Sequence, residues 1–256
     1  LFKKGGDMGV RKLKKEENAS ITIDHHRYEF PLTVGSENEI ALDISKLRSS
    51  TKGVVTLDEG FVNTASCKSS ITFLDGERGV LRYRGYAIED LAKKKSFAEV
   101  SYLLIYGELP TKKQLSDFEK NIQNKAIDND EVICEVINVL PKKSHPMAVL
   151  SSATVVLSSL YEGLSKQTLS QEEVSEAIYA VLGKYRNIAA WCHQKKTGES
   201  LAKKSISVDY TEAFLEMMFP NKDDSWRQEV KSIMNLLLIL HADHEQNCST
   251  SAVRLV

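Results

Sequence analysis

Two histidines near the C-terminal end of the sequence are the residues best suited to chemistry. His241 and His244 follow an apolar run and stand three residues apart, with Asp243 and Glu245 beside them. On a helix this spacing places both imidazoles on one face. Three interpretations stay open: a metal site, two histidines whose charge is favoured at a helix C-terminus, or, for His244, a group that binds an anion or places a proton on a carbonyl oxygen.

The metal interpretation lacks the motifs of known metal sites. Imidazoles and carboxylates at helical spacing can bind zinc or iron. However, neither the H-E-x-x-H order of zinc proteases nor the Glu-x-x-His order of di-iron bundles occurs here. We therefore predict no metal. The sequence also lacks a G-x-G-x-x-G or Walker loop that would hold a phosphate.

The four cysteines indicate reduced thiols. Cys67, Cys134, Cys192 and Cys248 are far apart and form no C-x-x-C pair. In a chain of 256 residues this pattern favours an intracellular protein over a disulfide framework. Cys248 has no evident base partner, so we expect it to pack as a small apolar side chain.

The other histidines are expected to be structural. His145 precedes Pro146 at a predicted helix start. His25 and His26 lie in a β-type segment and are expected at the surface, and His193 is expected in a core or an interface.

Helix-start signals show which elements position the candidate site. Three segments have a capping box, in which a Ser or Thr side chain accepts the N3 amide and a Glu or Gln reaches back. They are Ser96–Glu99, Thr111–Gln114 and Ser170–Glu173.

Two predicted helices are apolar enough to be central. One, 147–161, has Ser144 as its predicted cap and Pro146 in its first turn. The other, 227–244, has Ser225 as its predicted cap and carries the two histidines. Its apolar residues share one face at helical spacing: Val230, Ile233, Met234, Leu237 and Leu238.

The chain divides into three segments by pattern. Residues 1–19 form a basic leader, expected to be disordered or tag-like. Residues 20–85 are β-rich, with one strand closed by Pro31 and a hairpin around Asp75–Arg78. Residues 86–256 are helical. The predicted fold class is therefore mainly α, with a small N-terminal β appendage.

The charge balance gives no sign of a nucleic-acid or membrane partner. Lys and Arg total 34 and Asp and Glu total 35, so nothing indicates binding to nucleic acid or to a membrane surface. No apolar run approaches the ~20 residues that span a bilayer.

The basic leader lacks the apolar run of a secretory signal, and Glu16-Glu17 argues against an organellar presequence. We expect a cytoplasmic protein.

Four motifs resemble those of citrate synthases and occur in that family's order. They are LDGERGVLRYRGYAIEDLA (Leu74–Ala92), SFAEVSYLLIYGELPTKKQL (Ser96–Leu115), SHPMAVL (Ser144–Leu150) and LLLILHADHEQNCSTSAVR (Leu236–Arg254). The resemblance covers residues 20–256. It implies the multi-helical large domain of a citrate synthase, with the β appendage of the longer bacterial type.

The resemblance implies an acyltransferase of the tricarboxylic acid cycle. Such enzymes condense oxaloacetate with acetyl-CoA to give citrate and CoA, and acetyl-CoA is a substrate, so no cofactor is implied. In the family a carboxylate base removes a methyl proton while a histidine hydrogen-bonds the enolate oxygen. A second histidine polarises the ketone of oxaloacetate, arginines hold its carboxylates, and a closing domain excludes water.

Only the oxaloacetate-binding part of that machinery matches this sequence. His244 matches the family's oxaloacetate-binding histidine in H-x-D-H-E, and Asn247 is expected to help line the pocket. The G-P-x-H-G and G-F-G-H-R-V-Y motifs, which hold the family's other two histidines, do not occur here. We therefore assign no catalytic residue. We expect this chain to be the N-terminal part of the large domain and inactive alone.

Other functions stay open. A 2-methylcitrate synthase would use propionyl-CoA, and a non-catalytic helical scaffold could use His241 and His244 for metal. The family implies a homodimer or a larger homo-oligomer. Tyr161 and Lys184 lie near the region where some long bacterial members bind NADH, but residues 124–127 lack the expected basic and histidine residues, which disfavours that regulation.

Overall fold

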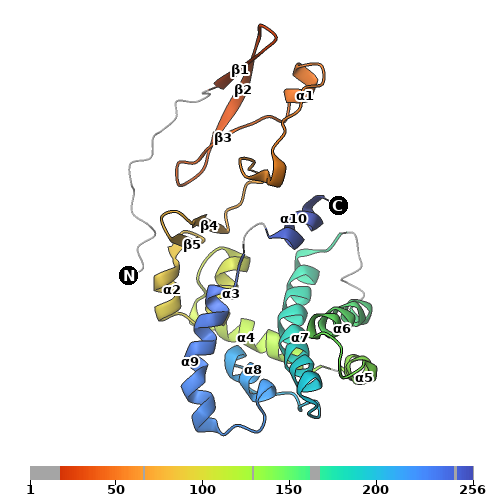
Figure 1. The fold of residues 1–256 in the computed structure, drawn as a ribbon. Coiled ribbons are helices and arrows are strands. Elements are labelled where there is room, and N and C mark those ends of the chain that lie inside the picture. The colour runs from red at the N-terminus through yellow and green to blue at the C-terminus, as the bar shows by residue number, and fades with distance from the viewer. Residues whose placement is uncertain (1–17, 66, 129, 162–167, 245–246, 256) are drawn as a thin grey trace. The chain divides into compact units, whose positions relative to one another are not determined.

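The computed structural model of the chain describes residues 18–65, 67–128, 130–161, 168–244 and 247–255 (Figure 1). The chain divides into two compact units, Leu1–Ser70 and Ile71–Val256. Within the described residues, no helix has both the length and the apolar character needed to cross a membrane.

The first unit is built on a three-stranded antiparallel sheet. Its strands are β1 (Asn18–Ile23), β2 (His26–Val34) and β3 (Ile40–Leu42), followed by the short helix α1 (Leu47–Ser50) and a 3₁₀ turn, η1 (Glu59–Phe61). The last two residues of the leader 1–19 thus belong to β1, and the rest of the leader lies outside the described residues.

A tight turn joins β1 to β2. Asp24 and His25 both have positive φ, 47° and 64°, which is the backbone of the two-residue turn whose twist fits a hairpin. His25 and His26 are exposed, as predicted.

The prediction that Pro31 ends the second strand is wrong, because β2 continues to Val34. Pro31 is the last β2 residue paired with β1, opposite Asn18, and pairing with β3 begins at Leu32. Its carbonyl still accepts the Asp43 N–H at 2.9 Å. Because the proline lies where one pairing ends and the next begins, its missing N–H costs the sheet little.

The second unit begins with another small antiparallel sheet, made of β4 (Thr72–Asp75), β5 (Val80–Tyr83) and β6 (Tyr86–Ala87). The predicted hairpin is confirmed, with Asp75 paired to Val80. This hairpin clusters with the helices, so the β-rich segment 20–85 is shared between the two units.

The rest of the second unit is helical, which confirms the mainly α fold class. Its helices are α2 (Ile88–Lys94), α3 (Phe97–Tyr106), α4 (Lys112–Ile127), α5 (Glu131–Val139), α6 (Pro146–Leu160), α7 (Gln171–Thr197), α8 (Tyr210–Met218), α9 (Asp224–Leu240) and α10 (Cys248–Leu255). The three predicted capping boxes are all present, at the starts of α3, α4 and α7.

Two other predicted caps are wrong by one or two positions. His145, not Ser144, caps α6, because its Nδ1 accepts a first-turn backbone N–H at 3.2 Å. Asp223, not Ser225, caps α9 by accepting a first-turn N–H at 2.8 Å. The structural role predicted for His145 is therefore confirmed.

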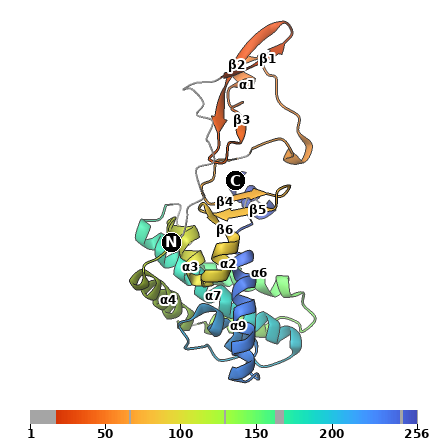
Figure 2. The ribbon, with the colours of Figure 1, turned by 90° about the vertical axis from the view of Figure 1, so that its left-hand side faces the viewer.

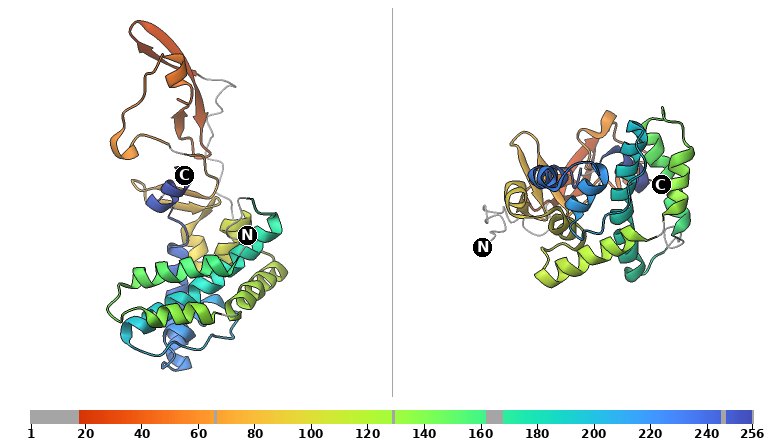
Figure 3. Two further views of the ribbon diagram at one scale, coloured as in Figure 1. Left: turned by 90° about the vertical axis from the view of Figure 1, so that its right-hand side faces the viewer. Right: turned by 90° about the horizontal axis from the view of Figure 1, so that it is seen from below.

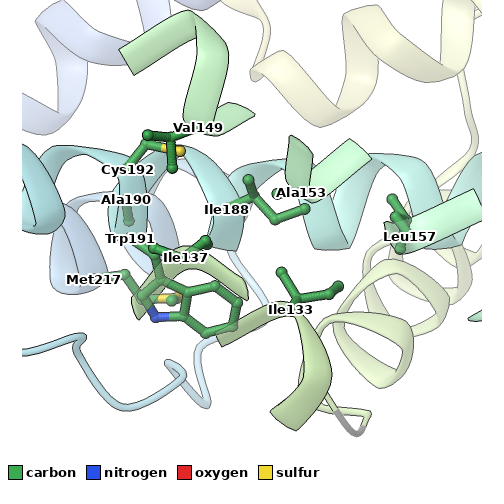
Figure 4. Close-up of a cluster of buried hydrophobic side chains, with 10 residues drawn as sticks. All are labelled: Ile133, Ile137, Val149, Ala153, Leu157, Ile188, Ala190, Trp191, Cys192 and Met217. Carbon is green, nitrogen blue, oxygen red and sulfur yellow. The ribbon is translucent and has the colours of Figure 1, made fainter. Parts of the chain in front are cut away.

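Helix α7 is the centre of the helical part and packs against α4, α5, α6 and α8 (Figure 3). The larger buried cluster lies along it. Ile188 and Trp191 of α7 pack with Ile133 and Ile137 of α5 and with Val149 of α6 (Figure 4).

A second cluster joins the β4–β6 sheet to α9. Its buried members include Tyr83 of β5, Leu91 of α2, Val100 and Leu103 of α3, and Ile239 of α9. Helix α9 lies along α2, and its C-terminal end meets the sheet (Figure 2). The two predicted site residues, His244 and Asn247, lie in the segment of chain after this end.

Candidate functional site

Helix α9 ends at Leu240, so the prediction of a helix through His244 is wrong. His241 is the C-terminal cap residue, and its backbone N–H donates to the Leu237 carbonyl (3.1 Å). Its ring Nδ1 lies 2.8 Å from the same carbonyl. Because a carbonyl only accepts, Nδ1 carries the proton and donates. This geometry favours the interpretation of His241 as a histidine satisfied at a helix end.

His244 lies beyond the helix and is exposed. It does not share a helical face with His241, yet the chain turn still brings their ring centroids to 5.8 Å, with 40° between the ring planes. His244 therefore presents an imidazole to solvent beside a ring that is itself fixed to α9.

Asp243 fixes the segment between the two histidines to the β-hairpin. Its carboxylate accepts a hydrogen bond from the Thr72 hydroxyl. The Tyr83 hydroxyl lies 3.4 Å from the Asp243 carbonyl oxygen and 3.4 Å from the Asp243 N–H nitrogen. The same hydroxyl lies 3.4 Å from the Ile239 carbonyl at the end of α9. Burial raises the pKa of Tyr83, so its hydroxyl keeps its proton at neutral pH.

Asn247 directly precedes α10 and caps it. Its side-chain oxygen accepts the Thr250 N–H (3.0 Å) and its backbone carbonyl accepts the Ser251 N–H (2.9 Å), as an N-cap residue does. Asn247 is exposed and follows His244 by three positions, so both residues of the predicted oxaloacetate site face solvent. Cys248, the first residue of α10, is also exposed, and the prediction that it packs as an apolar side chain is wrong.

The geometry offers little support for a metal. Across the part of the chain that the structure describes, no group of three or more His, Cys, Asp and Glu side chains is arranged to hold an ion. Glu245, which the sequence places beside His244, lies outside the described residues.

The remaining candidates lie elsewhere. The half-buried ring of His193 packs edge-on against Phe219 (5.7 Å between centroids), which fits the first of the two roles predicted for it, in a core or in an interface. Lys184 is buried, and burial lowers its pKa although Asp130 favours its charge. The Lys184 ammonium is thus paired inside the protein with the Asp130 carboxylate. Burial raises the pKa of Tyr161 to about 12.

The contacts that position the site could not be read from the sequence. Thr72 and Tyr83 stand more than 150 residues before Asp243 in the chain, and neither belongs to a chemical motif. The sequence did predict the hairpin that carries them. It did not predict that this hairpin packs beside the end of α9, because that depends on the whole fold.

The fold is that of a multi-helical domain. A small β-hairpin packs at the end of its apolar helix α9, and an exposed histidine follows that end. Residues 60–256 match the family model described as citrate synthase, C-terminal domain. The chain belongs to the citrate synthase family.

Individual relatives agree with this assignment. The chain is 40% identical to the citrate synthase of Corynebacterium glutamicum in an alignment of 255 positions that covers 97% of this chain and 57% of that protein. Solved citrate synthases with a similar structure include those of Thermoplasma acidophilum (TM-score 0.68, 26% identity, 77% of this chain and 50% of that chain) and Pyrobaculum aerophilum (TM-score 0.65, 33% identity, 76% and 49%). The Thermoplasma structure is a ternary complex with carboxymethyl coenzyme A and oxaloacetate. This chain thus spans about half the length of its relatives.

Proposed function

We propose that this chain is the oxaloacetate-binding part of a citrate synthase, an acyltransferase that condenses oxaloacetate with acetyl-CoA to give citrate and CoA. The observation that carries the proposal is the exposed His244, four residues after the end of α9, in a chain 40% identical to a citrate synthase. The solved relative with oxaloacetate and a coenzyme A analogue supports the same substrates.

The geometry suits a small dianion. An exposed imidazole can donate a hydrogen bond to a carboxylate or to the ketone oxygen of oxaloacetate. Asn247 and the N-terminus of α10 follow three residues later, and a helix N-terminus favours negative charge. These groups bind and orient. Proton abstraction from the thioester and closure over the site belong to motifs that do not occur in this sequence.

Binding to the chain tests the proposal. Calorimetry with oxaloacetate should show saturable binding that is lost in His244→Gln. His25→Asn is a matched control, because it removes an exposed histidine from a turn in the first unit and Asn tolerates the positive φ there. Equal binding by wild type and His244→Gln would overturn the role of His244.

We also propose that the chain alone does not turn over. Purified from a host that lacks citrate synthase, it should release no CoA above background with oxaloacetate and either acetyl-CoA or propionyl-CoA. CoA release would contradict this, and the preferred thioester would then separate citrate synthase from 2-methylcitrate synthase.

Exposed apolar side chains support a homodimer or a larger homo-oligomer. Val155 of α6 is 68% exposed and Ile233 of α9 is 59% exposed, although the apolar patterns of both helices predicted a central place in the fold. A second copy would cover such faces. Sedimentation should show a dimer at micromolar concentration that Ile233→Lys weakens, and a wild-type monomer at all concentrations would contradict the proposal for this chain.

A cytoplasmic location is proposed on the cysteines, which are all free: Cys67, Cys134, Cys192 and Cys248. Fractionation of the source cells should recover the protein with cytoplasmic markers, and recovery with a membrane or secreted fraction would reject it.

A further inference from the structure

We infer that Tyr83 and Thr72 are positioning residues for His244, because they fix its neighbour Asp243 to the β4–β5 hairpin. The inference deepens the proposed function and rests on it for the identity of the ligand. The three residues Thr72, Tyr83 and Asp243 are called the Asp243 anchor below.

The hairpin places both donors side by side. Thr72 and Tyr83 are cross-strand partners in the β4–β5 pairing, so their side chains lie on the same face of the sheet. The Thr72 hydroxyl donates to the Asp243 carboxylate, while the Tyr83 hydroxyl meets both backbone polar groups of Asp243 at 3.4 Å. Residues of β4 and β5 thus hold both the side chain and the backbone of Asp243.

The Tyr83 ring is itself held by packing. It is 0% exposed and packs in the cluster with Leu91, Val100 and Ile239. A hydroxyl donates one hydrogen and accepts through its lone pairs. It can therefore accept the Asp243 N–H and donate to the carbonyl of either Asp243 or Ile239. The hydroxyl ties the last turn of α9 to the residue before His244.

His244 depends on this anchor for its position. Its ring is exposed and lies against His241, which is held by its own hydrogen bond to Leu237. The segment from His241 to His244 is thus fixed at one end by α9 and before its other end by the hairpin. A binding group must be held within about 0.5 Å of its productive position to be effective, and the anchor supplies that restraint.

The decisive variant is Tyr83→Phe, which keeps the buried ring and removes only the hydroxyl. Tyr210→Phe is the matched control, because it also removes one tyrosine hydroxyl. That hydroxyl donates to the Leu182 carbonyl in α7 (3.2 Å) and not to a residue of the Asp243 anchor. Thr72→Val tests the second donor with nearly the same shape.

Two readouts separate this inference from the proposed function. The first needs no ligand: amide hydrogen exchange at Asp243 should accelerate about tenfold in Tyr83→Phe, and the His244 ring resonances should shift, while Tyr210→Phe leaves both unchanged. The second is oxaloacetate affinity, which should fall about tenfold in Tyr83→Phe and less in Tyr210→Phe.

The results of these measurements either support or overturn the positioning role. Faster exchange at Asp243 together with weaker oxaloacetate binding supports the inference. Wild-type exchange and wild-type His244 resonances in both Tyr83→Phe and Thr72→Val overturn it. If wild type binds no oxaloacetate, the proposed function fails for this chain, while the exchange and resonance data still support or overturn the positioning role.

Discussion

The Lys184 ammonium lies 2.5 Å from a carboxylate oxygen of Asp130, and both side chains are 1% exposed. Lys204 approaches the other carboxylate oxygen at 3.0 Å, and Lys184 also donates to the Asp128 carbonyl at 3.0 Å. The pair joins the start of α5 to the middle of α7, beside the larger buried cluster. Each charge depends on the other, because a buried ion without its partner is strongly unfavourable.

Removing one charge of this pair should therefore destabilise the fold. We expect Asp130→Asn to lower the free energy of unfolding by about 3 kcal/mol, since it leaves the Lys184 ammonium buried without its carboxylate. Urea denaturation measures the change. Asp90→Asn is the control, because its pair with Lys94 is about half exposed on both sides and solvent screens it, so the loss should be much smaller. Equal losses would show that the buried pair contributes no more than a surface pair.

Gly183 allows α7 to approach α4. A Cβ added there would lie 2.6 Å from the Ile122 carbonyl oxygen and 3.0 Å from the Ala126 nitrogen, both backbone atoms of α4. Gly183→Ala should therefore force the helices apart and lower the free energy of unfolding by about 2 kcal/mol, although alanine is the better helix former. Gly76→Ala, which has open space around its added Cβ, should have little effect. A stabilised Gly183→Ala protein would show that α4 can move freely.

Alkaline pH should destabilise the chain through two partly buried tyrosines. Burial raises the pKa of Tyr161 and Tyr210 from 10.0 to about 12. Between these values the unfolded chain has lost protons that the folded chain keeps, so the free energy of unfolding falls as pH rises. The contribution is fully present below pH 10. Unfolding at several pH values should show this loss, and Tyr210→Phe should make it shallower; stability that stays level up to pH 12 would refute the idea.

Local signals in the sequence predicted local structure well. Ser96, Thr111 and Ser170 start helices because the partners of each capping box lie three residues away. The end of α9 was mispredicted because it depends on distant residues. The apolar pattern continues to Leu240 and the polar residues after it could extend a helix, but Tyr83 holds Asp243 out of the helical path. The exposure of Asn247 and its role as a cap also required the position of α10.

Asn247 has two possible roles, and two substitutions separate them. Aspartate caps a helix as well as asparagine, whereas alanine loses about 1 kcal/mol. We therefore expect Asn247→Asp to keep α10 intact and Asn247→Ala to fray it, as read from the amide resonances of residues 248–255. If Asn247 also lines the oxaloacetate site, the added carboxylate will repel the dianion, and Asn247→Asp will lose oxaloacetate binding although its helix is intact. Wild-type affinity in Asn247→Asp would instead restrict Asn247 to the cap and leave His244 as the binding group of this segment.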